Sequence, residues 1–350
     1  MKAINWITLS LVASLTVLAQ KSSSSKPSYT PDQATARMTL PEGFTVTQFA
    51  AEPAVVQPFA FCFDDRGRVW VCENLNYETR KSDTFKAGPQ GRIIILEDTD
   101  GDGKFDTKKL FIDKLFFPTG LQVGFGGVWV GSPPNLLFIP DKNGDDIPDG
   151  DPKVVLDGWG RQDRHETLNS FTWGPDGWLY GAQGSTVSAS IIRPGLDPPD
   201  KAVKSMGQNI WRYHPERKVY EIYAEGGGNA FGVEIDSRGR VFSGHNGGDT
   251  RGFHYVHGAY YRKSWGKHGA LTNLHAYGFL PAMKNVAVER FTHQFIIYEE
   301  MALPERYRGK LLGVDVLHNN VVMSDIFPNG STFQTRDIER MVQTKDTWFR

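Results

Sequence analysis

A short phrase that this chain repeats four times constrains its fold more than any other feature. In each copy an apolar-x-apolar run is followed by a turn containing glycine, and then by an apolar residue next to an aromatic one. The copies run from Phe61 to Trp70, Leu121 to Trp129, Phe171 to Tyr180 and Val233 to Phe242. Their spacing of roughly 50–60 residues is typical of propeller blades rather than of helical solenoids.

Each copy has the pattern of a β-hairpin. Alternating apolar residues give the period of a strand, and Asp64-Asp65-Arg66-Gly67 or Gly174-Pro175-Asp176-Gly177 supplies the turn. A single hairpin cannot bury its apolar face, so these units must stack around a common axis. We therefore expect an all-β chain folded as a β-propeller.

Strand signals around the four copies outline the remaining blades. We expect the first blade to begin with a strand at Phe44–Phe49, and a fifth, outer strand pair at Lys310–Val314 and Asn320–Ser324. The segment from about Asp249 to Pro304 departs from the rhythm and is rich in aromatic residues, so we interpret it as a functional loop. Four hairpins and one pair do not close a ring. The prediction is an open arc whose strands after about Lys310 pack poorly.

The N-terminal segment has the pattern of a targeting sequence. Lys2 precedes an apolar stretch from about Ile4 to Ala19, which predicts a secretory signal peptide at residues 1–19, with an uncleaved membrane anchor as the alternative. Residues 20–39 contain a run of four serines and are interpreted as a disordered linker. Residues 40–350 form the predicted propeller domain, truncated at its C-terminus. The predicted location is periplasmic or secreted.

Charge and cysteine content limit the partners. The chain has 39 basic and 40 acidic residues without a Lys/Arg block, so no nucleic-acid partner is expected. Its two cysteines, Cys62 and Cys72, lie on the two strands of the first hairpin. In an exported protein they could pair as a cross-strand disulfide, or they could be two core thiols. Because a Cys-x-x-Cys motif is absent, no covalent haem site is expected in this chain.

Polar residues gather at the open ends of the four hairpins, which should share one face. They are Thr119, Asn169 and Asn229 before the strands, Asn74, Ser132, Gln183, His245 and Asn246 after them, and His165 and Glu166 upstream of Asn169. A concave polar site on a rigid scaffold is a usual place for a ligand. Any one member could instead satisfy loop backbone, but the ring as a whole predicts a pocket.

Two loops have acidic residues at alternate positions. The predicted metal ligands are Asp98, Asp100, Asp102 and Asp106 in the first loop, and Asp141, Asn143, Asp145 and Asp149 in the second. Oxygen ligands with this spacing, and a glycine that permits a tight turn, can surround Ca²⁺. The twelfth-position glutamate of an EF-hand is replaced by Lys109 and Pro152. We predict calcium in a structural role; the alternative is an acidic turn without metal.

Three segments resemble a known family. His165–Gly181, His245–Gly252 and Asp346–Arg350 are similar to the N-terminal propeller of the bacterial membrane-bound dehydrogenase family, and the resemblance extends over about Leu40 to Arg350. That family is more distantly similar to the soluble quinoprotein glucose/sorbosone dehydrogenases, six-bladed propellers that hold pyrroloquinoline quinone (PQQ). Its members often continue into a cytochrome c domain. The resemblance implies the six-bladed type, here incomplete with about four to five blades, and a cytochrome c domain or protein as partner.

The resemblance also implies roles for single residues. His165 precedes a Gly-Pro-Asp-Gly hairpin as the base histidine of those dehydrogenases does, and Asn229 matches the asparagine of their Arg-Asn pair. We place the cofactor on the polar face among Glu166, Asn169, Gln183, His245, Asn246 and Asp249. However, Gly228 stands in place of the arginine and Ala182 in place of an aspartate, which argues against quinone binding.

Together these features predict an exported oxidoreductase that acts on a sugar or an alcohol. His165 would be the general base, and a redox cofactor on the polar face would accept the electrons. The alternative is a non-catalytic propeller that binds glycans or a partner protein. A propeller fold by itself does not select between these functions.

Overall fold

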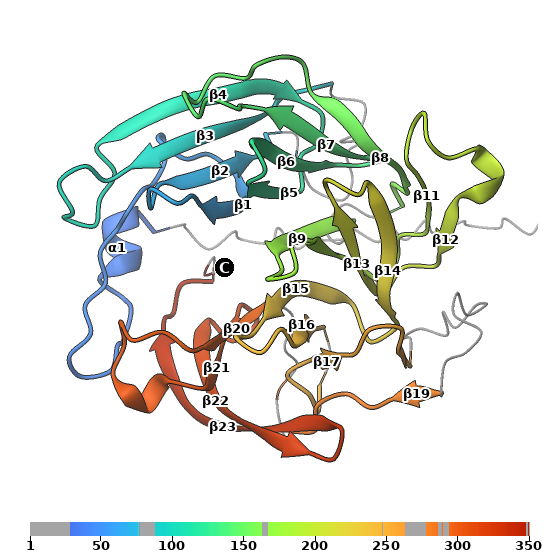
Figure 1. Ribbon diagram of the computed structural model, residues 1–350. Helices are drawn as coiled ribbons and strands as arrows, with labels where there is room; N and C mark the ends of the chain where they lie inside the picture. The colour runs from blue at the N-terminus through green and yellow to red at the C-terminus, as the bar shows by residue number, and fades with distance from the viewer. Residues whose placement is uncertain are drawn as a thin grey trace, which may run out of the picture.

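The computed structural model describes residues 29–75, 77, 88–162, 167–246, 248–262, 278–285, 289, 294–347 and 349. Within these residues the chain is almost entirely β, in five sheets that succeed one another around a common axis (Figure 1). Four of the sheets have four or more strands and one has three. The predicted β-propeller, with four to five blades, is therefore confirmed.

The first two blades come from the first half of the chain. Their strands are β1 (Pro58–Phe63), β2 (Val69–Glu73), β3 (Gly91–Glu97) and β4 (Thr107–Leu115), then β5 (Gly120–Val123), β6 (Gly127–Ser132), β7 (Asn135–Pro140) and β8 (Lys153–Trp159). The outer edge of the second blade is extended by β11 (Ala189–Ile192) and β12 (Val203–Ser205). These two strands interrupt the third blade in sequence, so the two blades are interleaved.

The remaining blades follow in chain order. The third has β9 (Leu168–Trp173), β10 (Leu179–Gln183), β13 (Asn209–His214) and β14 (Val219–Glu225), with β18 (Tyr260–Tyr261) and β19 (Phe279–Leu280) at its edge. The fourth has β15 (Ala230–Ile235), β16 (Val241–His245) and β17 (Phe253–Tyr255); the fifth has β20 (Phe295–Tyr298), β21 (Lys310–Asp315), β22 (Asn320–Asn329) and β23 (Thr332–Gln343). The short helices are α1 (Pro31–Thr35) and the 3₁₀ turns η2 (Pro199–Lys201) and η4 (Glu305–Tyr307).

The four repeated phrases form the innermost hairpins of the first four blades, as predicted. Gly67, Gly177 and Gly239 have φ of 78°, 76° and 73°, a left-handed conformation that glycine adopts without strain. Each donates its N–H to the carbonyl three residues earlier, at 2.8 to 3.1 Å. The aromatic residues that end the phrases are buried: Trp70, Trp129, Tyr180 and Phe242.

Burial between blades holds the ring together. β1 packs against β5, β5 against β9, β9 against β15 and β15 against β20, so the innermost strands line the axis in chain order. Between the second and third blades, Trp129, Leu136, Trp159, Leu179 and Trp211 form one apolar cluster. Each blade thus buries its neighbour's apolar face, which no isolated hairpin can do.

The prediction that strands after Lys310 pack poorly is wrong. β20 to β23 form a complete four-stranded sheet, in which Leu311 is fully buried and Met323 is 3% exposed. The predicted outer pair, Lys310–Val314 and Asn320–Ser324, forms the second and third strands of this sheet. The innermost strand β20 was not predicted from the repeated phrase, because it is joined to β21 by a long connection that contains η4 and not by a glycine turn.

The predicted strand at Phe44–Phe49 is also wrong, since these residues belong to no sheet. The N-terminal segment lies between the first and fifth blades (Figure 1). Thr39 exchanges two backbone hydrogen bonds with Gln343 at the end of β23, at 2.7 and 3.1 Å. The ring of Phe44 packs edge-on against Tyr307 with centroids 5.5 Å apart. The segment therefore covers the outer side of the fifth blade, which would otherwise expose its apolar residues.

Both cysteines are free, which excludes the disulfide. Cys62 lies opposite Trp70 and Cys72 lies opposite Ala60, so the two residues do not face each other across the hairpin. Burial raises the pKa of Cys62 to about 12 and also raises the pKa of Cys72. The thiols therefore stay protonated and serve as core residues.

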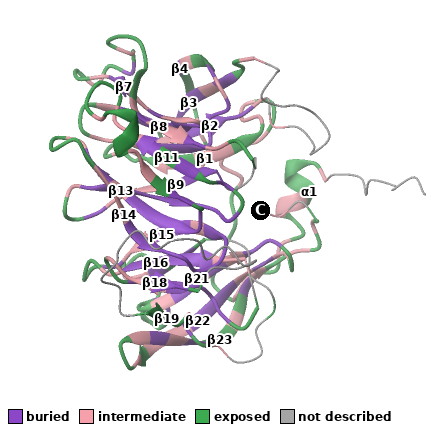
Figure 2. Ribbon diagram, turned by 90° about the vertical axis from the view of Figure 1, so that its right-hand side faces the viewer, coloured by how far each residue is buried: buried purple, intermediate pink, exposed green. Residues whose placement is uncertain are grey.

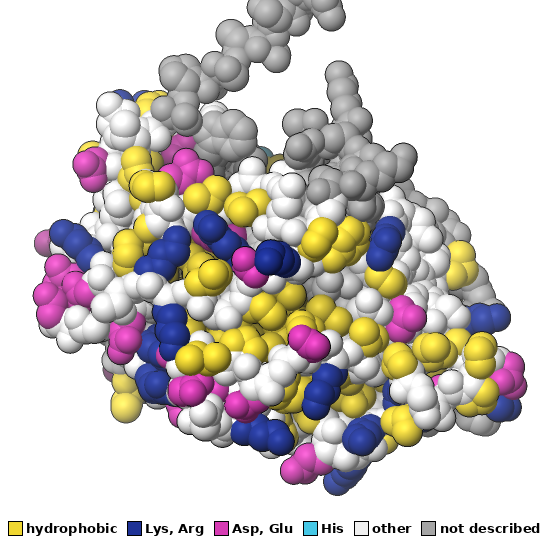
Figure 3. All heavy atoms as spheres, turned by 90° about the horizontal axis from the view of Figure 1, so that it is seen from above, with side chains coloured by type: hydrophobic (Ala, Val, Ile, Leu, Met, Phe, Trp, Pro, Cys, Tyr) yellow, Lys and Arg dark blue, Asp and Glu magenta, His cyan; other side chains and the backbone are white. Residues whose placement is uncertain are grey.

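The surface agrees with the balanced charge of the sequence. On the side seen in Figure 3, basic and acidic side chains are interspersed among apolar ones and no block of one sign stands out. The predicted signal peptide lies outside the described residues. Among the residues that are described, no helix has the length and apolar character needed to cross a bilayer.

Candidate functional site

The open ends of the hairpins share one face, as predicted. We call it the open-end face: β1, β5, β9 and β15 begin there, and β2, β6, β10 and β16 end there. In the edge-on view of Figure 2, α1 and the label that marks the C-terminus lie together on one side of the molecule, at the right of the picture. The opposite face, which carries the tight turns, is the turn-end face.

The polar residues predicted at the open-end face join neighbouring blades. Asn74 Nδ2, at the end of the first hairpin, donates to the carbonyl of Pro118 at 3.1 Å. Thr119 Oγ1 in turn donates to the carbonyl of Leu168 at 2.6 Å, which links the second blade to the third. Asn74 and Thr119 are at most 3% exposed. These side chains therefore satisfy the backbone between blades, the role named above as the alternative to ligand binding.

Gln183 and Asn229 are held in the same way. Gln183 Nε2 donates to the carbonyl of Val187 at 2.8 Å, and its Oε1 accepts from Asn209 Nδ2 at 3.2 Å. Asn229 Oδ1 accepts from the backbone N–H of Ser185 at 2.7 Å. Asn229, which was predicted to act in catalysis, thus uses its side-chain oxygen to fix the loop after β10.

Three buried amide atoms near this face have no hydrogen-bond partner among the described residues. They are Asn74 Oδ1, Asn169 Nδ2 and Asn209 Oδ1. Asn169 keeps one bond, because its Oδ1 accepts from Ser170 Oγ at 2.7 Å. Leaving a buried amide atom unpaired costs about 1–3 kcal/mol. A water molecule or a ligand hydroxyl would remove that cost.

The remaining residues predicted at this face either lie outside the described residues or contact other parts of the chain. His165 and Glu166 lie outside the described residues. Asp249 accepts at its backbone carbonyl from Asn285 N, at 3.3 Å. Two residues later, Arg251 Nε donates to Asp337 Oδ1 at 3.1 Å and joins the segment after β16 to the fifth blade. Burial would raise the pKa of Asp337, but the hydrogen bond and charge of Arg251 outweigh it and lower that pKa.

The positions that depart from the quinoprotein pattern are filled by this chain's own atoms. A Cβ placed on Gly228 would lie 1.3 Å from Nδ1 of His245, so a larger side chain enters only if His245 moves. Ala182 is fully buried in an apolar cluster with Ile210 and Tyr180, where an aspartate would be an unpaired charge. The residues present therefore do not fit a quinone held by the donors that the resemblance implies.

The first acidic loop keeps a set of oxygen ligands. Carboxylate oxygens of Asp98, Asp100 and Asp106 lie within 4.8 Å of one another, and Asp102 is not part of that group. Asp98 Oδ1 also accepts from Gly101 N at 2.7 Å, so the turn has backbone support of its own. Three carboxylates at this distance match the oxygen ligands that Ca²⁺ prefers.

The second acidic loop is bound by cations of the protein itself. Arg68 donates two hydrogen bonds of 2.8 Å to Asp146, a residue that the alternate spacing did not mark, and Lys109 Nζ lies 3.4 Å from the same carboxylate. The hydrogen bond from Arg68 holds the pKa of Asp146 below its usual range. The predicted ligands Asp141, Asp145 and Asp149 do not form a three-carboxylate group, and Asn143 Nδ2 donates to Asp145 Oδ2 at 2.9 Å.

A cleft of about 490 Å³ opens on the turn-end face between the first three blades. Its lining includes Phe63 of β1, Gln122 of β5 and Trp173 of β9, with Asp141 and Lys142 from the loop after β7. Phe63 is 62% exposed, whereas Asp141 Oδ1 is buried and has no partner among the described residues. The sequence analysis assigned the hairpin turns a structural role and the loop after β7 to calcium, so it did not predict this cleft. The available signal was the pair of aromatic residues at alternate positions of β1, Phe61 and Phe63.

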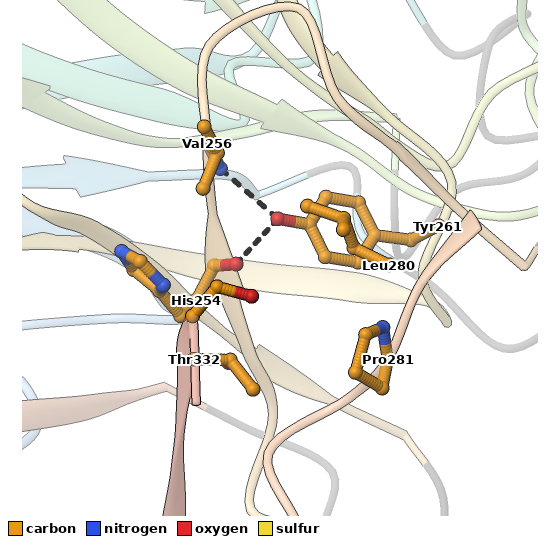
Figure 4. Close-up of a pocket in the computed structure, with 7 residues that line it drawn as sticks. His254, Val256, Tyr261, Leu280, Pro281 and Thr332 are labelled. Atoms are coloured by element: carbon orange, nitrogen blue, oxygen red, sulfur yellow. Dashed lines mark hydrogen bonds between the residues drawn. The ribbon is translucent and has the colours of Figure 1, made fainter. Parts of the chain in front are cut away.

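A smaller hollow lies beside β17 (Figure 4). Tyr261 fills it: its hydroxyl accepts from Val256 N at 3.0 Å and donates to the carbonyl of His254. Leu280, Pro281 and Thr332 close the other sides, and no room remains for a water molecule. This hollow is therefore not a ligand site.

Comparison with solved structures places the fold. An oxidoreductase (glucose dehydrogenase) from Thermus thermophilus is 16% identical, with a TM-score of 0.51 over 82% of this chain and 83% of that chain. The PQQ-bound aldose sugar dehydrogenase from Streptomyces coelicolor is 15% identical, with a TM-score of 0.51 and coverage of 81% and 81%. A Trichoderma reesei carbohydrate-active enzyme of family AA12 is 13% identical, with a TM-score of 0.57 and coverage of 89% and 88%. This distant likeness to sugar-dehydrogenase propellers confirms the fold.

Sequence comparison gives the family. No curated protein matches the chain. One family model, described as "Domain of unknown function (DUF7133)", matches residues 30–350, which is most of the 350-residue sequence. The chain therefore belongs to the family of the domain of unknown function DUF7133.

Proposed function

We propose that this dehydrogenase-like propeller binds a saccharide in the turn-end cleft. The observation that carries the proposal is an exposed aromatic ring, Phe63, in the same cleft as a buried carboxylate oxygen without a partner among the described residues, Asp141 Oδ1. A sugar offers both complements, because its C–H face packs on an aromatic ring and its hydroxyls donate to a carboxylate. A cleft that combines aromatic walls with converging polar side chains is a usual form of a small-molecule site.

One wall of the cleft is held in place by a hydrogen bond, and one of its cations is already paired. Trp173 Nε1 donates to the carbonyl of Val123 at 2.7 Å, which fixes the indole ring as a wall. Arg68 also lines the cleft, but its guanidinium is committed to Asp64 and Asp146. Because that cation is already paired and the lining carries more carboxylates than cations, a neutral polyhydroxylated ligand suits the cleft better than an anion.

Titration calorimetry with neutral oligosaccharides tests this proposal. Phe63→Ala removes the exposed ring and should weaken binding by roughly tenfold. Phe61→Ala is the matched control, since Phe61 is 65% exposed on the same strand but does not line the cleft. Asp141→Ala should weaken binding as well. Equal affinity in Phe63→Ala and Phe61→Ala would contradict the proposal.

A second function, oxidation of a sugar or an alcohol at the open-end face, is favoured by two atoms that lack a partner among the described residues, Asn74 Oδ1 and Asn169 Nδ2. In this proposal the two amides hold a substrate hydroxyl, and His165, four residues before Asn169, would remove its proton as general base. A redox cofactor bound at this face would take the hydride from the carbon and pass the two electrons to the external acceptor. His165→Ala should then lower turnover with an artificial electron acceptor by about 10²-fold or more at unchanged melting temperature. Saccharide binding without turnover would leave the non-catalytic function.

The remaining expectations belong to the same proposal. We propose a structural Ca²⁺ at Asp98, Asp100 and Asp106, export to the periplasm or medium, and a cytochrome c domain or protein as the electron-transfer partner of the oxidation. A bound ion stabilises only the folded state, so EDTA should lower the melting temperature and Ca²⁺ should restore it. Melting curves that coincide with and without Ca²⁺ would exclude the ion.

A further inference from the structure

We propose that the turn connecting β21 to β22 binds a first-row divalent transition metal, with Zn²⁺ as the representative ion. The ligand atoms are His318 Nδ1, Asp315 Oδ2 and Glu289 Oε2, with Asn320 Oδ1 as the fourth. This site is separate from the turn-end cleft, from the acidic loops and from the polar ring around the axis. The proposal therefore does not depend on the function proposed above.

The separations between the three ligand atoms are close to those of a formed site. His318 Nδ1 lies 2.8 Å from Asp315 Oδ2 and 3.4 Å from Glu289 Oε2, and all three atoms fall within 4.8 Å of one another. Zinc–ligand bonds of about 2.0–2.2 Å at tetrahedral angles put neighbouring ligand atoms roughly 3.3 Å apart. Small side-chain movements would therefore bring all three onto one ion.

The hairpin itself positions Asp315 and His318. Asp315 Oδ1 accepts from the backbone N–H of Leu317 at 3.2 Å and of His318 at 3.3 Å, which turns Oδ2 toward the imidazole. The same imidazole nitrogen thus lies beside two carboxylate oxygens. Asp315 is only 3% exposed, and a buried carboxylate requires a cation or hydrogen bonds nearby. A metal ion would meet this requirement more fully than the single proton of a histidine.

Asn320 supplies an independent observation. It is paired with Asp315 across β21 and β22, so the two side chains lie on the same side of the sheet. Its Nδ2 donates to the carbonyl of His318 at 3.2 Å, but its Oδ1 is buried and has no partner among the described residues. The side chain is 2% exposed, so bulk water does not satisfy that oxygen. A cation bound between Asp315 and His318 would satisfy this amide oxygen, which is carried by the cross-strand neighbour of Asp315.

The ligand types select the metal class. An imidazole nitrogen together with carboxylate oxygens suits zinc and its first-row neighbours, whereas Ca²⁺ takes oxygen ligands alone. Arg340 is the competitor: its NH2 lies 3.2 Å from Glu289 Oε2 and its side chain is half exposed. In the absence of metal, arginine provides the counter-charge for Glu289. Metal binding should displace it.

The test uses the full-length protein, stripped with EDTA and titrated with Zn²⁺ by calorimetry. We expect one tight equivalent and a raised melting temperature. His318→Ala and Glu289→Gln should each weaken that equivalent by about tenfold or more, and Arg340→Gln should strengthen it because the competing cation is gone. Asp315 is left intact, since a buried carboxylate is the substitution most at risk of unfolding the hairpin.

His257→Ala is the matched control. His257 Nε2 lies 3.2 Å from Glu221 Oε1, an exposed histidine–carboxylate pair that is not part of a three-ligand group in the described part of the chain. Its removal should leave zinc affinity unchanged. Two results would overturn the proposal: wild-type protein that takes up no zinc, which would leave a histidine–carboxylate cluster only, or His318→Ala and Glu289→Gln variants that bind as tightly as wild type.

Discussion

Two contacts that join neighbouring blades, one at each face of this propeller, use different chemistry. At the turn end the contact is charged, because Arg68 of the first blade donates two 2.8 Å hydrogen bonds to Asp146 of the second. At the open end it is neutral, as in the 2.6 Å bond from Thr119 Oγ1 to the carbonyl of Leu168. A buried ion pair leaves an uncompensated charge when one partner is removed, whereas a neutral hydrogen bond leaves only an unpaired dipole.

The contrast indicates where spare binding capacity lies. At the open end several polar atoms of the predicted ring are already used between blades, and among the described residues single amide atoms such as Asn169 Nδ2 have no partner. At the turn end the ion pairs are internal to the wall, and Phe63, Asp141 and Lys142 stay available in the cleft. A high count of polar residues is therefore a poor guide to a ligand site when those residues also hold the blades together.

The largest expected effect is at the charged contact. Arg68→Ala would leave Asp146 and Asp64 without their guanidinium, in side chains that are about one-tenth exposed or less. Removing one partner of such a buried pair costs about 3–5 kcal/mol of unfolding free energy. Denaturant unfolding measures it. Arg193→Ala, which breaks the more exposed pair with Asp197, is the control and should cost about 1 kcal/mol or less. Equal losses would mean that burial does not make the Arg68 contact stronger than a surface ion pair.

The next effect concerns a close contact at the open end. In Gly228→Ala the new methyl group meets His245 Nδ1, since an ideal Cβ lies 1.3 Å from that atom. Overpacking of this kind costs about 2–3 kcal/mol. Combining it with His245→Ala should cancel most of the loss, and a double-mutant cycle on unfolding free energies reads out the coupling. Additive losses would mean that backbone, rather than the imidazole, opposes a side chain at 228.

A third effect depends on pH. Burial raises the pKa of Glu234 from 4.5 to about 7, although Ile297 N donates to its carboxylate at 3.0 Å. The folded state therefore holds this proton more tightly than the unfolded state, so the stabilisation is present below pH 4.5 and is lost as pH rises toward 7. Glu234→Gln keeps the acceptor without the charge and should be more stable than wild type by roughly 1–2 kcal/mol at about pH 8. At about pH 4.5 the two should unfold alike; a constant difference across pH would point to another cause.

The fold was largely predictable because its determinant is local. The repeated phrase places a glycine turn and a buried aromatic a fixed distance apart, as at Gly67 and Trp70, and four hairpins follow from it. The fifth blade was misread because η4 stands where its glycine turn should be. The prediction of a strand at Phe44 was wrong because tertiary contacts position this segment. Thr39 pairs with Gln343, a contact between the two ends of the described chain that no local sequence pattern contains.

The site was less predictable because its determinants are contacts between distant residues. Spacing marked Asp141 and Asp145 but not Asp146, which is selected by Arg68, 78 residues away. Position 228 could be recognised as a missing arginine, but not as a space occupied by His245. Only the folded structure shows which polar groups are hydrogen-bonded to neighbouring blades and which are left for a ligand.

The smallest expected effect isolates the neutral chemistry of the open end. Thr119→Val keeps the shape of the side chain and removes the hydroxyl that donates to Leu168 O at 2.6 Å. Thr119 is 3% exposed, so water does not readily replace the donor, and the carbonyl loses its side-chain partner. The cost should be about 1 kcal/mol, clearly below that of Arg68→Ala in the same denaturant series. Because no charge is involved, the loss of unfolding free energy should not change with salt, whereas the more exposed Arg193–Asp197 pair should weaken as salt is added.

A loss of unfolding free energy at Thr119→Val as large as that at Arg68→Ala would contradict this expectation. It would show that a neutral hydrogen bond at the open end stabilises the contact between blades as much as the ion pair at the turn end does.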